Sequence, residues 1–484
     1  MRAICRELGL ALAAFAGGCT VSSNYTVPPS PLTGRFTAAD AISDRAMDDA
    51  WWRGFDDPLL AELVNRAVAG NTDLAAARAR IDQSRALAKA AGAALLPSVD
   101  LTGGASRVEQ LLETPVGRVT RTLGLPRGYT QYDAGAQASW EIDLFGGARR
   151  GREAARADLA AAQAEEGALR VSVASETADA YLALRAPQAR QVVAEDQERN
   201  QAGLVDLVQR RFVEGLAAER ELNRAKAGLE GVRARTAPLR AGIAMEMNRI
   251  DVLTGVQAGS TRSSLVPFTI IPTAPNPAGS VSAADLLRRH PDIVAAERRL
   301  AASHARVGQA ISNYYPRISL SGLIGVASLG TSRLFDGSAV QASGTGGLRW
   351  RLLDFGRIDA EVGQARGVEA GALAPWRGAA LRATEEVQTA LLTLTESRIE
   401  RTALMRQVDV LRAARRQAQD AYRAGVVGLI DVTDADRDLL FASDSLAIAT
   451  GNQARAAVAA YRDLGGGWQA EAPAALASAA PGHM

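Results

Sequence analysis

The sequence predicts an α+β membrane protein made of a duplicated repeat, with two long-helix hairpins and four transmembrane β-strands in each chain. Three observations lead to this prediction: motifs recur at a constant spacing, a period-two hydrophobic pattern precedes each recurrence, and a very long alanine-rich segment follows it. Because four strands cannot close a barrel, we expect three chains to form a trimeric 12-stranded β-barrel on a long α-helical barrel.

The duplication shows as a constant offset between landmarks. One motif recurs 210 residues later, and the same offset relates two glycine turns and two helix ends. The matched residues are Trp140, Phe145 and Gly146 with Trp350, Phe355 and Gly356, then Gly215 with Gly425, and Gly255 with Gly465. One offset therefore relates the two halves over most of their length.

Upstream of that motif the offset is 219 residues, since Asp73 matches Asp292 and Pro97 matches Pro316. The change from 219 to 210 places a nine-residue insertion between Pro97 and Trp140. We therefore expect the first pair of strands to carry the longer connection.

Each half begins with a helix and continues with strands. Asp57-Pro58 is an N-cap followed by proline at the first helical position, which predicts one helix over residues 59–95. Period-two alternation then begins at residue 98 and returns over residues 133–143; in the second half it begins at residue 318 and returns over residues 348–352. Strands of about 9 to 11 residues suit the thickness of a bilayer.

A long helix follows each pair of strands. The distance from Gly146 to Gly215 is 69 residues, as is the distance from Gly356 to Gly425, and one continuous helix of that length would reach roughly 100 Å. After each glycine turn the chain returns for 40 residues. Such lengths predict coiled-coil packing rather than a globular core.

Two tryptophans lie near the ends of the predicted strands. Trp140 and Trp350 each precede the strand-to-helix phenylalanine by five residues, a place that suits an interfacial aromatic girdle. The alternative is that they are core residues of a soluble sandwich, for which the long helices leave little room.

The N-terminus has the pattern of an export signal. In residues 1–18, Arg2 and Arg6 precede an apolar run, and small residues then precede Cys19. This pattern resembles a bacterial lipobox, which implies that Cys19 is acylated, with palmitate as one of its acyl chains, and becomes the first mature residue. The alternative is an ordinary signal peptide with an incidental cysteine.

The other boundaries follow from composition. We expect a lipid-anchored linker over residues 19–57, a first repeat over 58–255, a proline-rich connector over 256–282, a second repeat over 283–468 and a flexible tail over 469–484.

Composition and motifs exclude two classes of protein. The 55 basic and 53 acidic residues give a net charge of +2 and no basic block, which argues against a nucleic-acid partner. Of the three histidines, His483 lies in the tail, while His290 and His304 are expected at surface positions of one helix. No nucleophile elbow, P-loop or zinc-ligand spacing occurs, so we expect no catalysis, no metal site and no cofactor.

Three further motifs stand in a specific order: WWRGFDDPLL at 51–60, LDFGR at 353–357 and LGGGW at 464–468. In order and spacing the chain resembles the TolC-like outer-membrane efflux protein family, in particular the OprM/NodT-type lipoprotein branch of RND efflux systems. The resemblance covers residues from about 20 to 468. It implies the Gram-negative outer membrane, with a helical barrel that extends into the periplasm.

The resemblance also implies a function and partners. The function is that of an outer-membrane channel subunit of a tripartite efflux pump, a passive exit duct for drugs or other small toxic compounds. The partners are two further copies in a homotrimer, a periplasmic adaptor (membrane fusion) protein, an inner-membrane RND-type transporter and outer-membrane lipid.

The two glycine turns are similar to the helix tips through which this family meets its adaptor. The matching residues are Arg211, Gly215, Leu216, Tyr422, Gly425 and Val426, and the second tip carries Ala421 where the first carries arginine. The simpler interpretation is that glycine caps a helical hairpin, and the two interpretations are compatible.

An acidic pair follows the second tip. Asp431 and Asp434 are three residues apart and share one helical face, for which a solvated face is the simple interpretation. The resemblance implies that they line a periplasmic gate, where a trimer would place six carboxylates around one axis and attract cations. At the 210-residue offset they match Glu221 and Arg224, and we expect an Arg224–Asp434 link between neighbouring hairpins to hold the closed state.

Two other functions remain open from the sequence: a type I protein-secretion outer-membrane duct and a structural coiled-coil envelope protein. The alternating strands and duplicated tips argue against the structural protein. The lipobox and the LGGGW motif resemble the efflux branch more than the secretion duct.

Overall fold

The computed structural model describes residues 21–29, 32, 34, 36, 48–277 and 283–468. The chain divides into two compact units. The described parts of residues 1–27, 82–160 and 298–374 form the first unit, and those of residues 28–81, 161–297 and 375–484 form the second. The two helices of 67 residues begin in the first unit and end in the second.

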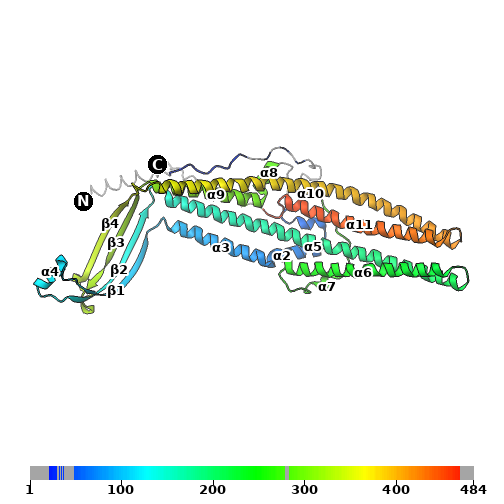
Figure 1. The fold of residues 1–484 in the computed structure, drawn as a ribbon, viewed down its shortest axis with the longest axis horizontal. Coiled ribbons are helices and arrows are strands. Elements are labelled where there is room, and N and C mark those ends of the chain that lie inside the picture. Colours follow the sequence, from blue (N-terminus) through cyan, green and yellow to red (C-terminus); the bar gives the residue numbers. More distant parts are fainter. Residues whose placement is uncertain are drawn as a thin grey trace, which may run out of the picture. The chain divides into compact units, whose positions relative to one another are not determined.

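The first unit contains one antiparallel sheet whose strands follow chain order (Figure 1). The strands are β1 (Ser98–Glu109), β2 (Gly128–Ile142), β3 (Arg317–Ser328) and β4 (Val340–Arg349). Three of them are longer than the sequence predicts. The alternation after residue 348 is not strand beyond Arg349, because the chain turns there toward the next helix.

The register gathers the apolar side chains on one face of the sheet. Directly paired residues point to the same face, and the pairs Leu101–Ala136, Ala136–Ile324 and Ile324–Ala342 cross all four strands. The same face carries Val99, Ala134, Ala138, Trp140, Ile142, Ile318, Leu320, Val326, Val340 and Leu348. The other face carries Asp100, Thr102, Asp133, Gln137, Ser319, Ser321, Ser343 and Thr345, with Val108, Leu323 and Ala327 as apolar exceptions.

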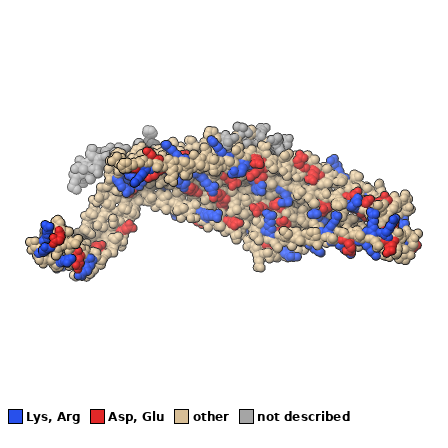
Figure 2. Space-filling view, in the orientation of Figure 1, with Lys and Arg blue, Asp and Glu red and all other residues tan. Residues whose placement is uncertain are grey.

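The apolar face is exposed in the single chain. Leu101 is 87% exposed, and Ile324 and Leu348 are 64% and 68% exposed. Figure 2 shows few charged side chains over the strands, whereas both signs of charge surround the tip that carries the helix of the first hairpin. An exposed apolar sheet face with a polar opposite face is the pattern of a membrane-spanning barrel wall.

Within the described residues, β1 and β4 each pair on one side only. Their outer edges therefore present unpaired backbone N–H and C=O groups, which are not tolerated in hydrocarbon and are a template for another strand. The sheet can therefore pair with a further strand at each of its two edges.

The two hairpins of the sheet differ at their ends as the offset predicts. The connection from β1 to β2 contains helix α4 (Pro115–Thr122), whereas the connection from β3 to β4 contains only the short turns η4 (Thr331–Arg333) and η5 (Gly337–Ala339). The insertion therefore lies in the first hairpin.

The opposite ends of the strands are built alike in the two halves. Trp140 Nε1 donates to the carbonyl of Leu95 at 3.0 Å, and Trp350 Nε1 donates to the carbonyl of Tyr314 at 2.9 Å. The donors are 210 residues apart and the acceptors 219, which are the two offsets of the sequence. The duplication is therefore confirmed as a structural one.

In the second unit, the short turn η2 (Trp51–Phe55) precedes two helices where the sequence predicts one. The prediction of a single helix over 59–95 is wrong, because α2 (Pro58–Gly70) ends before α3 (Thr72–Ala93) begins. Asn71 separates them: its Oδ1 accepts from the N–H groups of Asp73 and Leu74 at 2.9 and 3.2 Å and so starts a new helix. The predicted cap at Asp57 is confirmed by bonds to two N–H groups of α2.

The long helices are confirmed. The outgoing helices α5 (Gly147–Val213) and α10 (Arg357–Arg423) have 67 residues each, and the returning helices α6 (Glu219–Leu253) and α11 (Leu429–Asp463) have 35 each. Equal lengths in the two halves agree with the 210-residue offset.

Two bidentate ion pairs join α5 to α11 in the second unit. Arg190 donates to both carboxylate oxygens of Asp444 at 2.7 and 3.1 Å, and Arg455 donates to those of Asp179 at 2.6 and 3.1 Å. α11 also buries a run of small residues along its second half. The two hairpins of one chain therefore pack closely along α11.

The connector between the halves is fastened to α5. It contains α7 (Arg262–Leu265) and is described as far as residue 277. The described chain resumes with α8 (Ala283–Arg289) and α9 (Pro291–Ile311), and the short turn η3 (Ser312–Tyr314) follows α9 directly. Arg185 of α5 donates to the carbonyl of Pro267 at 2.8 Å, and Gln188 donates to the carbonyl of Leu265 at 2.8 Å. These hydrogen bonds hold the proline-rich segment against α5.

Arg185 is the largest fully buried side chain of the described residues. Its Nη2 donates to the hydroxyl of Tyr181 at 3.0 Å, and that hydroxyl donates to Asp57 Oδ2 at 2.6 Å. Burial and the bond to Asp57 raise the pKa of Tyr181 to about 12. One network therefore links the cap of α2, the middle of α5 and the connector.

Candidate functional site

Each helical hairpin of the second unit ends in a tight glycine turn. Gly215 and Gly425 have φ of +74° and +75°, a conformation that favours glycine. The N–H of Leu216 donates to the carbonyl of Arg211 at 2.7 Å, and the N–H of Val426 donates to that of Ala421 at 2.9 Å. This is the hydrogen-bond pattern of a glycine helix cap, so the capping interpretation is confirmed at both tips.

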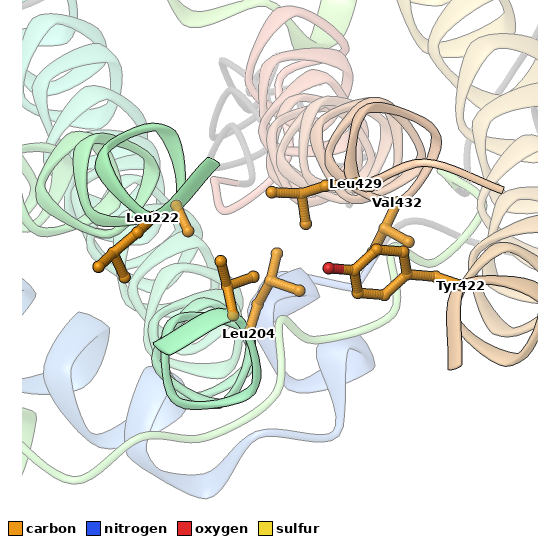
Figure 3. Packing of buried hydrophobic residues seen from close by; sticks show 7 residues of the cluster. Leu204, Leu222, Tyr422, Leu429 and Val432 are labelled. Carbon is orange, nitrogen blue, oxygen red and sulfur yellow. The ribbon is translucent and has the colours of Figure 1, made fainter. Parts of the chain in front are cut away.

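An apolar cluster, the tip cluster, holds the two hairpins together just behind these turns (Figure 3). All four long helices contribute to it, and the labelled side chains converge between the α5–α6 and α10–α11 pairs. Its members are Leu204, Val208, Leu222, Ala225, Tyr422, Leu429 and Val432. The two tips therefore form one packed end of the chain.

Tyr422 belongs to this cluster and not to the exposed surface of the tip, and its assignment as an adaptor-contact residue stays a prediction. Its side chain is only 4% exposed, and its hydroxyl has no hydrogen-bond partner among the described residues. The guanidinium carbon of Arg211 lies 4.7 Å from the centre of the Tyr422 ring, a cation–π contact between the hairpins. This contact between Arg211 and Tyr422 stabilises the packed interior of the tip.

The outer surface of the tips exposes large apolar side chains among charged ones such as Glu214 and Arg423. Val213, Leu216 and Val426 are 77%, 65% and 76% exposed, and Phe212 and Ile430 are also exposed. Large apolar side chains gathered at the end of a helical hairpin are typical of an interaction surface.

The acidic pair lies in the first turns of α11. Asp431 is exposed, and its Oδ2 accepts from the N–H of Gly428 at 3.0 Å, which caps the helix. Asp434 is half-buried and lies 3.6 Å from Arg437 on the next turn. Both carboxylates thus have a local partner.

The proposed Arg224–Asp434 link is not formed within the described chain. Arg224 is exposed on α6, Glu221 is half-buried one turn earlier, and neither forms an ion pair with α11. The link was expected between neighbouring hairpins, and a contact between two copies of the chain stays a prediction.

A buried ion pair that the sequence did not indicate lies next to this acidic turn. Arg415 Nε of α10 donates to Asp436 Oδ1 of α11 at 2.5 Å, and Asp436 is only 2% exposed. Burial raises the pKa of Asp436, and the guanidinium of Arg415 opposes this effect. The apolar stripe Leu429, Val432 and Leu440 includes position 436, and an aspartate in that stripe was the signal for a buried partner.

Both described histidines are buried or half-buried, so the expectation of surface positions is wrong. His290 is 7% exposed, and His304 Nδ1 lies 2.7 Å from Glu369 Oε1. Packing against neighbouring segments covers them. Among the described residues, no group of three or more His, Cys, Asp and Glu side chains is placed to hold a metal ion.

Three predicted features concern the membrane. Trp140 and Trp350 lie at the strand-to-helix corners and are 37% and 49% exposed. Cys19 lies outside the described residues. None of the described helices is both long and apolar enough to cross a bilayer.

The family model of the outer membrane efflux proteins matches two segments of the chain, residues 63–256 and 283–466. The chain belongs to the outer membrane efflux protein family. It is therefore an outer-membrane efflux channel protein and not an enzyme, as the sequence predicts.

Named relatives match over nearly their whole length. The chain is 31% identical to the pyoverdine export outer membrane protein OpmQ of Pseudomonas putida, over 94% of this chain and 96% of that protein. It is 28% identical to the nodulation protein T of Rhizobium leguminosarum bv. trifolii, over 95% and 97% of the two chains.

Solved structures of outer-membrane channels share the fold. The outer-membrane channel OprN is 33% identical, has a TM-score of 0.84 and matches 93% of this chain and 100% of its own. The open state of the MtrE outer membrane channel of Neisseria gonorrhoeae has a TM-score of 0.82 at 22% identity, with 94% and 99% covered. The predicted α+β fold with a duplicated repeat is thus confirmed for this efflux protein.

Proposed function

We propose that three copies of this chain form the exit duct of a tripartite efflux pump for drugs or other small toxic compounds. The observation that carries the proposal is the four-stranded sheet with two free edges and a single exposed apolar face. Three such sheets give twelve strands, which is within the range of outer-membrane barrels. The long helices of three chains then continue the duct into the periplasm.

The proposed partners are a periplasmic adaptor at the helix tips and, beyond it, an inner-membrane RND-type transporter. The exposed apolar residues around Gly215 and Gly425 support the adaptor site, with Leu216 and Val426 as the central contacts. Arg211 belongs to the site as the group that supports Tyr422. Relatives named for pyoverdine export and for antibiotic or toluene efflux support the export of small compounds.

We also propose that Cys19 carries a lipid anchor. The chain shortly after it is held at a strand-to-helix corner of the first unit, where Arg150 Nη2 donates to the carbonyls of Ser22 and Ser23 at 3.0 and 3.2 Å. The N–H of Val21 donates to the carbonyl of Phe145 at 3.4 Å. This corner of the first unit, which holds Val21, is where the aromatic girdle of Trp140 and Trp350 is proposed, and it supports an anchor on the preceding residues.

The gate proposal assigns Asp431 and Asp434 to a ring around the axis of the trimer, with Glu221 and Arg224 on the neighbouring hairpin. We predict that the double substitution Asp431→Ala with Asp434→Ala will lower the cation-over-anion permeability ratio severalfold, because it removes six negative charges from one constriction. Arg224→Ala will increase the conductance if it frees the neighbouring hairpin. Single-channel recording of the purified protein in planar bilayers measures both quantities.

The control for the gate is Asp409→Ala, since Asp409 is exposed on α10 and pairs with Arg412 at 3.3 Å. That variant should leave conductance and selectivity unchanged. Wild-type selectivity in the double variant would contradict the gate without touching the exit-duct proposal, and a purified protein that opens no channel at all would contradict the duct.

A further inference from the structure

A polar cavity of about 310 Å³ lies in the second unit, where α5, the start of α9, α10 and the last turn of α11 meet. Its polar lining consists of Ser172, His290, Asp292, Glu386, Arg462 and Asp463. Asp463 ends α11, so the cavity is at the opposite end of that helix from the tip. Neither the gate nor the adaptor site uses these residues.

His290 offers an unused ring nitrogen to this cavity. Its side chain is more than nine-tenths buried, and Nδ1 has no hydrogen-bond partner among the described residues. The nearest carboxylate oxygen, Oδ2 of Asp292, lies 3.7 Å away and beyond hydrogen-bond distance. Burial lowers the pKa of His290, so the ring is neutral near neutral pH and one of its nitrogens is a free acceptor.

The duplication supplies an internal control for this residue. At the offset of 219 residues His290 corresponds to Asn71, whose amide is fully used. Asn71 Nδ2 donates to the carbonyl of Leu253 at 3.1 Å, and its Oδ1 caps α3. In the second half, an imidazole with one unpaired nitrogen stands where the first half has a fully hydrogen-bonded amide. The counterpart of Leu253 in the second half is the charged Asp463.

Glu386 also lacks a partner that its counterpart in the first half has. At the offset of 210 residues it corresponds to Glu176, which has Arg249 as a partner at 4.0 Å. The residue that corresponds to Arg249 is Ala459, and Glu386 forms no ion pair among the described residues. Burial is the first cause that raises the pKa of Glu386, and the charge of Asp463 is the second.

The charges of the lining do not balance. Arg462 donates to Asp463 at 2.7 Å and so neutralises it. Asp292 and Glu386 remain, on two different helices and without a cation of their own. Both carboxylates are exposed, with the Asp292 side chain 66% exposed, so they favour a cation through their charge and not through burial. The cavity therefore has room and charge for a cation with two positive ends.

We propose that this cavity binds a small organic diamine, whose ammonium groups would pair with Asp292 and Glu386 and donate to the free nitrogen of His290. A directly coordinated metal ion fits less well, because the acidic and imidazole groups are not placed to surround one ion. An ammonium group has several N–H donors, and the two ammonium groups of a diamine can reach acceptors that are too far apart to surround one metal ion. This binding site goes beyond the exit-duct function and does not depend on it.

The test is isothermal titration of the purified full-length protein with butane-1,4-diamine. We expect one saturable site per chain in the wild type. Glu386→Gln should weaken the affinity at least about tenfold, because it removes one of two charged contacts. His290→Asn, which installs the residue of the first half, should weaken it as well and is expected to preserve folding.

The matched control is Glu176→Gln, the same change at the corresponding position of the first half, which should leave the affinity unchanged. Absence of saturable heat in the wild type would overturn the proposal, as would equal losses in the two glutamine variants. Equal binding of Mg²⁺ with displacement of the diamine would overturn the choice of ligand. A wild type that conducts ions but binds no diamine would leave the exit duct intact.

The affinity should also fall as the pH is lowered. Protonation of Glu386, whose pKa is raised, removes a negative charge, and protonation of His290 adds a positive one, so both changes oppose a cation. α5 contributes no titratable side chain to the lining. The charged groups that act on Glu386 are Asp292, Arg462 and Asp463 from other helices and Arg382 from α10 itself.

Discussion

Replacing Arg185 with methionine will lower the free energy of unfolding by about 3 to 5 kcal/mol, because it removes a fully buried cation from a hydrogen-bonded network. The substitution removes the donor to the carbonyl of Pro267 and to the hydroxyl of Tyr181, and with it a positive charge beside the hydrogen bond between Tyr181 and Asp57. It also removes the cation from the face of the Tyr181 ring, which lies 4.7 Å from the guanidinium carbon. Denaturant unfolding followed by tryptophan fluorescence measures the loss.

The control for this prediction is Arg190→Met on the same helix. Arg190 pairs with Asp444 with similar distances but is about one-third exposed, so its loss should cost less than about 1 kcal/mol. Arg185→Lys should rescue only part of the stability, since an ammonium cannot reproduce the planar fork that reaches four acceptors. Equal losses for Arg185→Met and Arg190→Met would contradict the role given to the buried network.

Placing a charge on the helix tips will abolish export without unfolding the protein. Leu216→Asp and Val426→Asp change side chains that are 65% and 76% exposed in the chain, so folding should change by less than about 0.5 kcal/mol. An apolar contact with the adaptor would instead bury an unpaired carboxylate, which is strongly unfavourable. In a strain that lacks the chromosomal copy, tolerance to any compound that the wild type protects against should fall to the level of the deletion strain.

The matched control for the tips is Leu125→Asp in the connection between β1 and β2, where the leucine is 55% exposed. This variant should keep full tolerance. The tip variants should still reach the outer membrane and still conduct ions in planar bilayers. Full tolerance in cells that carry both tip substitutions would show that the adaptor does not bind there.

Much of the fold could be predicted because its signals are local or periodic. Alternation around Leu101 and Trp140 gives the two faces of the sheet, since side-chain direction along a strand depends only on position. Gly215 and Gly425 end the long helices through their own backbone conformation. The two offsets then fix which segments of the halves correspond.

The missed features depend on segments that are distant in the sequence. Asn71 ends one helix and starts another because its amide also reaches the carbonyl of Leu253, and nothing around residue 71 indicates that neighbour. Tyr422 is buried because it packs in a cluster that includes side chains of the other hairpin, and because Arg211 of that hairpin lies against its ring. Burial of this kind is a property of packing and not of periodicity.

Only part of the candidate site could be predicted from the sequence, again because the rest depends on contacts between distant segments. The acidic pair and the glycine turns could be read from spacing, whereas the Arg415–Asp436 pair needs two helices brought into register. Position 436 carries lysine at the corresponding place of the first half, Lys226, so the duplication did not indicate a buried aspartate. Differences between the halves, rather than their likeness, mark the residues that need a specific explanation.

The central claim, that three incomplete sheets close one barrel, is tested most directly by disulfide cross-linking between β1 and β4. Leu101→Cys is combined in turn with Val340→Cys, Ala342→Cys or Leu348→Cys. Within one sheet the two strands are about 14 Å apart, which is too far for a disulfide, so any bond must join two chains. We predict that at least one pair gives covalent trimers after oxidation and that each single-cysteine variant gives none. Monomers from every pair, or an open ladder that continues beyond three chains, would contradict the closed trimer.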